Sequence, residues 1–270
     1  MQIAPIPSLS EEINDIRLRT ADIVANRIIP NEGVIYGGGE KSAKIRKEIR
    51  EEVKKQGLWA PHLPEEYGGM GNGFLTHAYM NEVLAWSPLG NRLFGVIAPN
   101  SGNQKILVKY GTEEQKKKWL IPLINQEMES GFSMTEPDSP GSDPRSLKTT
   151  AVKEGDEWVI NGHKIMTSNG NRADFLVVMC RTEDDDDDSG NANMKMTQII
   201  VPTDTPGVTK VRSVPIWGHT GGDHMEIKYE NVRVPLENAL GARGSGHQAA
   251  QDRLGAGRVY HCMNTIGQMW

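Results

Sequence analysis

A run of closely spaced hydroxyl groups, Phe132 to Asp143 (FSMTEPDSPGSD), is the part of the sequence best suited to hold a polar ligand. It starts at what reads as the end of a strand, and Pro137, Pro140 and Gly141 then turn the chain. A turn of this kind can present backbone N–H groups and Ser or Thr oxygens to a bound group. From residue types alone, an ordinary surface turn stays open as the alternative.

Two glycine-rich stretches, Gly68–Gly73 and Gly241–Gly246, are similar to phosphate-binding loops in composition only. A dinucleotide fingerprint needs a strand before the glycines and a helix after them in a βαβ unit, and neither stretch has that setting. His219 and His224 lie close in sequence, but no second pair or carboxylate at ligand spacing completes a metal site. No serine lies in a nucleophile-elbow pattern. The sequence therefore predicts turns, packed or exposed histidines, and no metal site.

The elements that must position these residues begin with a helical part that runs from Ser8 to about Trp119. Ser8 with Glu11 three residues later is typical of a capping box. Residues 41–56 form a second amphipathic segment with apolar side chains at i, i+4 and i+8. Thr112 is a predicted N-cap, because two glutamates follow it in the first turn of the next segment.

From about Gly131 the period changes to that of strands. Residues 157–170 (EWVINGHKIMTSNG) predict two strands joined by a hairpin turn at Asn161–Gly162. Further strand-like runs follow at 173–180, 197–203 and 224–235, and a helical pattern resumes at Gln248. Helices, then strands, then a helix predict an α+β fold with segregated layers.

Composition narrows the class of protein. The net charge of the 270 residues is -5, so the basic footprint of a nucleic-acid-binding protein is absent. No apolar run approaches the ~20 residues that span a bilayer, and neither end carries a targeting pattern. Cys180 and Cys262 lack disulfide or metal spacing, which predicts two buried thiols in a reducing compartment. The acidic run 183–188 predicts a solvated loop.

Four stretches in order resemble the signatures of the acyl-CoA dehydrogenase family: MTEPDSPGSD, NGHKIMTSNGNRADFLVV, YENVRVPLENALG and RGSGHQAAQDRLGAGRVYHCMNTIG. The helical first part fits as well. The resemblance implies an N-terminal all-helical domain (1–128), a β-barrel or sandwich-like flavin-binding middle domain (129–240), and the first helix of an incomplete C-terminal helical bundle (241–270). It leaves open the cytoplasm, mitochondrion or peroxisome for a soluble protein of this kind.

The resemblance also implies FAD as the cofactor and assigns residues to it. The positions that match flavin-contacting ones are Phe132, Met134, Thr135, Gly141, Ser142, Met166 and Ser168. Met166 stands where the family usually has a tryptophan, and Ser168 stands in place of a threonine, which keeps the hydroxyl. Ser142, Leu254 and Arg258 match positions that face the acyl-CoA substrate.

The activity implied is α,β-dehydrogenation of an acyl-CoA thioester, with hydride transfer to flavin N5. The base, a Glu in most of the family, is expected beyond Trp270, and the alternative base position on the last helix holds only residues 255–257 (Gly-Ala-Gly). Asp252 lies near but does not match. We also expect the apolar stripe of that helix to lack a packing partner and stay exposed; it consists of Val259, Cys262, Met263 and Ile266.

Partners and rival functions follow from the same resemblance. Electron-transfer flavoprotein is the implied electron acceptor, and full-length family members form homo-oligomers. An acyl-CoA oxidase or nitroalkane oxidase-like flavoenzyme shares the fold and differs in whether reduced flavin reacts with oxygen. A non-catalytic flavin- or CoA-binding fragment is the alternative from a different class.

Overall fold

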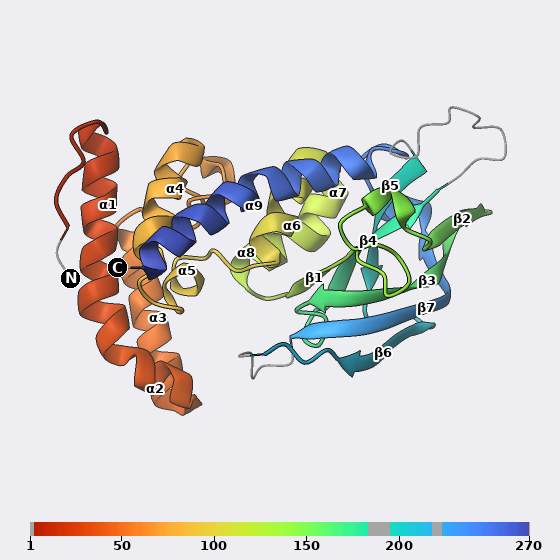
Figure 1. The fold of residues 1–270 in the computed structure, drawn as a ribbon, viewed down its shortest axis with the longest axis horizontal. Helices are drawn as coiled ribbons and strands as arrows, with labels where there is room; N and C mark the ends of the chain where they lie inside the picture. Colours follow the sequence, from red (N-terminus) through yellow and green to blue (C-terminus); the bar gives the residue numbers. More distant parts are fainter. Residues whose placement is uncertain (1–2, 183–194, 218–222, 270) are drawn as a thin grey trace. The chain divides into compact units, whose positions relative to one another are not determined.

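The computed structural model describes residues 3–182, 195–217 and 223–269 (Figure 1). The chain divides into two compact units, Met1–Ser101 with Leu254–Trp270, and Gly102–Arg253. The acidic run 183–188 and His219 lie outside the described residues. The division of the chain at 128/129 and 240/241 therefore stays a prediction.

The first unit is helical, as the sequence predicts. Its helices are α1 (Glu11–Ile23), α2 (Glu32–Gly37), α3 (Gly39–Lys55), α4 (Gly73–Leu84), α5 (Gly90–Leu93) and the later part of α9 (Gly246–Gln268), with short helical turns at Val24–Ile28, Ile29–Asn31 and Glu65–Tyr67. The cap predicted at Ser8 is wrong: Ser10 is the N-cap, and its hydroxyl accepts from the Ile13 N–H at 3.3 Å. An N-cap hydroxyl accepts from a free backbone N–H two or three residues later in the helix. Ser10 has this spacing to Ile13, and Ser8 is two residues too early.

The apolar stripe predicted on the last helix lies on α9 and is largely exposed. Val259 and Ile266 are 42% and 45% exposed, as expected, while Met263 is half-buried. The prediction of two buried thiols is wrong for Cys262, which is exposed on this helix, and confirmed for Cys180. Apolar neighbours in the sequence do not bury a thiol when the helix face that carries them is open to solvent.

The second unit joins a helical segment to a sheet. Its helices are α6 (Asn100–Tyr110), which begins at the boundary, α7 (Glu113–Gln115) and α8 (Ile121–Asn125), with helical turns at Lys116–Leu120, Pro144–Ser146 and Leu236–Asn238. Thr112 is the N-cap of α7 and forms a capping box with Gln115, as predicted. The Gln115 side chain also donates to the backbone oxygens of Glu237 and Ala239 at 2.7 and 2.9 Å, which ties this helix to the chain that leaves the sheet.

The described strands form one eight-stranded sheet (Figure 1). They are β1 (Ser130–Ser133), β2 (Thr150–Glu154), β3 (Glu157–Ser168), β4 (Phe175–Arg181), β5 (Met196–Pro202), β6 (Val208–Ser213), β7 (His224–Pro235) and β8 (Ala239–Leu240). The order is β6-β7-β3-β1-β4-β5-β8, and β2 pairs with both β3 and β4. Pairing is antiparallel except where β4 meets β1 and β2. The α+β prediction is confirmed.

The hairpin predicted at Asn161–Gly162 is wrong, because both residues lie inside the continuous strand β3. The turn is at Gly155, whose φ of +61° suits a tight reversal, between Glu154 and its partner Glu157. Gly162 serves a different need. A Cβ there would lie 2.3 Å from the Thr149 hydroxyl oxygen, so glycine permits a close approach at a register irregularity of β3.

Candidate functional site

The first residues of the loop that joins β1 to β2 lie against β3, where two consecutive carbonyls hold them. The Met134 oxygen accepts from the Lys164 ammonium at 2.8 Å. The Thr135 oxygen accepts from the Ile165 N–H, also at 2.8 Å. Strand β1 ends at Ser133, so these bonds continue the attachment of the chain to the sheet past the last residue of the strand.

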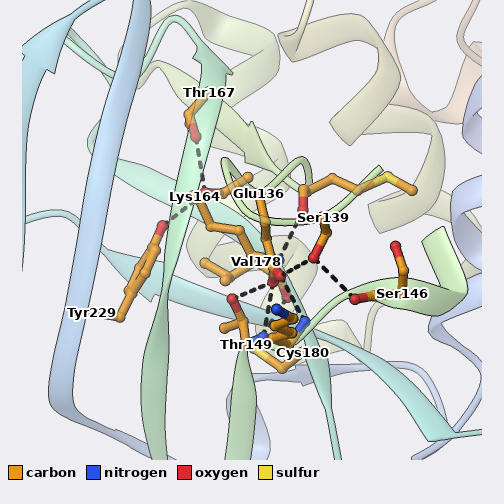
Figure 2. Close-up of polar contacts among 12 residues, drawn as sticks. Glu136, Ser139, Ser146, Thr149, Lys164, Thr167, Val178, Cys180 and Tyr229 are labelled. Atoms are coloured by element: carbon orange, nitrogen blue, oxygen red, sulfur yellow. Dashed lines mark hydrogen bonds and ion pairs between the residues drawn. The ribbon is translucent and has the colours of Figure 1, made fainter. Parts of the chain in front are cut away.

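Glu136 follows directly and is buried with its carboxylate fully engaged (Figure 2). It pairs with Lys164 at 2.9 Å, and the side chains are 4% and 0% exposed. Thr149 donates to it from its backbone and its hydroxyl, at 2.8 and 2.6 Å. The Lys148 N–H and the Ser139 hydroxyl donate at 2.6 and 3.2 Å. The Glu136 carboxylate thus links the start of the loop to its end at Lys148 and Thr149.

The ionisation states of Glu136 and Lys164 follow from their contacts. Burial alone raises the pKa of Glu136, but the Lys164 ammonium and the bonds from Thr149 and Lys148 lower it to about 2. Burial lowers the pKa of Lys164, and the Glu136 carboxylate opposes that effect. Glu136 is therefore ionised at neutral pH, and Lys164 is its counter-ion.

The interior beside the pair is polar but uncharged. The Tyr229 hydroxyl donates to the Ser133 hydroxyl at 2.9 Å, and Ser133 bonds the Thr167 hydroxyl at 3.0 Å. Figure 2 labels Tyr229 and Thr167. Burial raises the pKa of Tyr229, and it raises the pKa of Cys180 to about 12. Both groups stay protonated at neutral pH, so neither supplies a base or a thiolate.

Met166 and Ser168 lie at the far end of β3. Met166 is 39% exposed and has a φ of +59°, at the register irregularity between Lys164 and Thr167. A left-handed conformation is uncommon for a residue with a side chain, and such strain gathers at functional sites. The Ser168 hydroxyl lies 3.0 Å from His224 Nδ1, and Ser168 is the register partner of Phe132 on β1.

Phe132 is half-buried and carries a cation on its ring face. The Arg253 guanidinium carbon lies 4.0 Å from the ring centroid, and its Nε donates to the Asn103 side chain at 3.2 Å. Burial lowers the pKa of Arg253 to about 10, which leaves it charged at neutral pH. Phe132 and Met134 also pack against a small apolar cluster made of Leu147, Met179, Met196 and Ala250.

The second half of the loop lies at the surface. Gly141 and Ser142 are exposed, and a Cβ on Gly141 would meet Thr135 Cγ2 at 3.3 Å. Asp143 caps the short turn Pro144–Ser146 by accepting from the Arg145 N–H at 3.1 Å. Its bonds are local, so this half of the loop is shaped by its own residues.

The structure thus gathers the predicted flavin residues on β1, the following loop and β3 of one unit. Leu254 and Arg258 belong to the other unit, where Leu254 is half-buried and Arg258 is exposed. The sequence interpretation did not single out Glu136, Lys164 or Arg253. Lys164 lies in β3 between the buried residues Ile160 and Thr167, and a lysine inside such a strand is the signal that points to a buried pair.

Asp252, which lies near the family's alternative base position, is already engaged. Its carboxylate pairs with Lys109 at 2.5 Å and accepts from Tyr110 and from Gln248. The bonds from Lys109 and then Tyr110 lower the pKa of Asp252. A carboxylate held in this way is a poor proton acceptor.

Among the described residues, no group of three or more His, Cys, Asp or Glu side chains could hold a metal ion. Within the same residues, no helix has the length and apolar character that crossing a membrane requires.

Comparison with known proteins adds the family. Residues 10–127 match the acyl-CoA dehydrogenase N-terminal domain and residues 131–232 match the middle domain. A probable acyl-CoA dehydrogenase, FadE2 of Mycobacterium tuberculosis, is 38% identical over 271 residues, which cover 96% of this chain and 65% of that protein.

Solved structures agree. One from Mycobacterium abscessus, assigned as an acyl-CoA dehydrogenase, has a TM-score of 0.84 and 30% identity, over 98% of this chain and 68% of that one. The glutaryl-coenzyme A dehydrogenase structure with glutaryl-CoA has a TM-score of 0.74 and 25% identity, over 99% and 65%. The chain therefore spans about two thirds of these relatives, and it belongs to the acyl-CoA dehydrogenase family.

Proposed function

We propose that the chain is the flavin-holding part of an FAD-dependent acyl-CoA dehydrogenase, which oxidises an acyl-CoA thioester across its α and β carbons. Membership of the family supports the reaction class. The observation that carries the proposal for this chain is that the seven matched residues, scattered over 132–168, lie on adjoining elements of one unit.

The side chains present fit a flavin ring. Among the seven are three hydroxyl groups, two thioethers, one aromatic ring and one glycine, and none of them is charged. Hydroxyl and N–H groups suit the carbonyl and ring nitrogen atoms of a flavin, and thioethers give polarizable contact with its faces. Gly141 lies close enough to Thr135 that a larger residue would crowd the loop. When bound, FAD would accept the hydride.

Each residue then has a task in this proposal. Met134 and Met166 pack against the ring, Thr135 and Ser168 bond its polar edge, and Ser142 meets the pyrophosphate and the thioester side. Leu254 and Arg258 face the CoA moiety, where the Arg258 cation suits a phosphate. We assign no base within these 270 residues, because residues 255–257 have no acid group and Asp252 is ion-paired.

The electron acceptor is the remaining part of the proposal. Electron-transferring flavoprotein is the acceptor that the family resemblance favours. Among the structural neighbours is one described as the electron transferring flavoprotein of Acidaminococcus fermentans, with a TM-score of 0.72 and 28% identity. An oxidase would instead pass electrons to oxygen, and aerobic reoxidation of the reduced flavin distinguishes the two.

The test is the visible spectrum of the purified 270-residue chain after incubation with FAD, followed by anaerobic addition of an acyl-CoA. A bound flavin spectrum that bleaches supports the dehydrogenase. A bound flavin that does not bleach agrees with a flavin-holding part that has no assigned base among these 270 residues, and the non-catalytic alternative predicts the same result. A chain that takes up no FAD contradicts the proposal.

A further inference from the structure

The buried Lys164–Glu136 pair controls one peptide group of the candidate flavin loop. The Lys164 ammonium donates both to the Glu136 carboxylate, at 2.9 Å, and to the Met134 carbonyl, at 2.8 Å (Figure 2). A carbonyl that accepts from a buried side chain is turned toward the interior. The orientation of the Met134–Thr135 peptide is therefore set from within the unit.

Planarity of the peptide fixes what lies on its other side. In a trans peptide the N–H points opposite to the preceding C=O. Because the Met134 C=O faces Lys164, the Thr135 N–H faces away from the pair. Within the described part of the chain, the Thr135 N–H donates to no other group. The next carbonyl, that of Thr135, is held by Ile165, so the donor cannot easily rotate away.

Stability alone does not account for the pair. Removing two charges from water is costly, and well-packed apolar side chains of similar volume often stabilise a core at least as well. The loop, however, has little other attachment. Among the residues that the structure describes, the bond from Ile165 is its one backbone bond to a strand between Met134 and Lys148. Glu136, which accepts from Thr149, Lys148 and Ser139, supplies the missing anchorage at the point where the loop begins.

We propose that Lys164, with Glu136 as its counter-ion, is a positioning residue that presets the Thr135 N–H as a donor to the polar edge of the flavin. This inference rests on the proposed function, since it names FAD as the acceptor. A preset donor spares the reorganisation that binding would otherwise require. The pair touches no ligand itself and acts through the peptide that Lys164 holds.

Two variants separate the effect of the hydrogen bond from Lys164 to Met134 from the effect of the charge on Glu136. Glu136→Gln keeps an oxygen for the Thr149 donors and leaves Lys164 able to donate to Met134. It also leaves the Lys164 ammonium buried without its counter-ion, and the unfolding midpoint records that cost separately from FAD affinity. Lys164→Met in the Glu136→Gln background removes that donor as well, without leaving a buried charge unpaired. The comparison is made by FAD dissociation constant, by the shape of the flavin absorption band, and by the unfolding midpoint of the FAD-free chain.

We expect Glu136→Gln to bind FAD within about twofold of the unaltered chain, and the double variant to bind about five- to tenfold more weakly, as for the loss of one well-placed hydrogen bond. The flavin band should change shape in the double variant only. Equal FAD affinity and equal spectra in the two variants would overturn the positioning role, while leaving the proposed function standing. An unaltered chain that binds no FAD would overturn the proposed function and the ligand named here together.

A second measurement covers a double variant that fails to fold. Amide hydrogen exchange at Thr135 is followed in the unaltered chain with and without FAD. Strong slowing of this one amide by FAD supports the preset donor. Exchange of the Thr135 amide that FAD leaves unchanged, in a chain shown to bind FAD, would overturn the inference.

Discussion

Between β1 and β2 the chain passes from a segment anchored to β3 through the buried Glu136, Met134–Ser139, to a segment held by local contacts, Pro140–Ser146. The first is attached to β3 by the Lys164–Glu136 pair and by the Ile165–Thr135 bond. The second is shaped by local contacts of Asp143, whose side chain is 38% exposed. The same loop thus combines a half attached to β3 with a half held by its own local hydrogen bonds.

The difference fits the two kinds of ligand group that the proposed function assigns to the loop. A flat ring has few internal degrees of freedom, so donors fixed in advance suit it. A pyrophosphate is flexible and its oxygens can be met in several ways, so an exposed turn with Gly141 and Ser142 is sufficient. Substitutions in the first half should therefore lower the stability of the whole unit, and substitutions in the second half should have only local effects.

The largest effect is expected for Lys164→Met alone. It leaves the Glu136 carboxylate buried without its counter-ion, and breaking a buried pair in this way typically costs about 3–5 kcal/mol. Denaturant unfolding of the variant measures the loss. A free energy of unfolding within error of the unaltered chain would show that the pair is not a fixed part of the interior.

A somewhat smaller effect is expected from pH. The folded pKa of Glu136 is about 2, below its ordinary 4.5, so this carboxylate stabilises the fold fully above pH 4.5 and loses that contribution as the pH falls toward 2. The contribution is on the order of 3 kcal/mol. Unfolding free energies between pH 5 and 2, compared for the unaltered chain and Glu136→Gln, should show a flatter profile for the variant. Parallel profiles would contradict the assigned ionisation.

The smallest effect is expected for Asp143→Ala in the surface half. Asp143 caps a short turn and pairs with Arg145 in the open, where hydrogen bonds and ion pairs contribute little. The denaturation midpoint should stay close to that of the unaltered chain and far above that of Lys164→Met. Equal losses in the two variants would remove the contrast between the halves of the loop.

Sequence patterns predicted the elements of this fold better than their connections. Residue pattern located α3 by its apolar stripe at helical spacing, and β4, β5 and β7 by runs rich in apolar and β-branched residues. The Asn161–Gly162 hairpin failed, since pairing of β3 with β7 along its whole length outweighs the local turn preference of two residues. Gly162 is required because Thr149 packs against it, and this contact is between residues too far apart in sequence for a local pattern to show it.

The candidate site was predicted in part for a similar reason. Motif resemblance drew attention to the residues that would face a ligand, such as Thr135 and Ser168. It passed over Lys164, which lies 28 residues after Glu136 and meets it only when the loop folds over β3. Pairing across such a distance depends on the sheet, and sequence spacing carries no direct sign of it.

The measurement that tests the central claim most directly is an equilibrium titration of the 270-residue chain with FAD, repeated for Ser168→Ala and for Thr209→Val, an exposed β6 position that serves as the control. The account predicts saturable binding of FAD, unchanged affinity in Thr209→Val, and affinity about two- to tenfold weaker in Ser168→Ala, as for the loss of one hydrogen bond. No saturable binding, or the same affinity in Ser168→Ala as in the control, would contradict it.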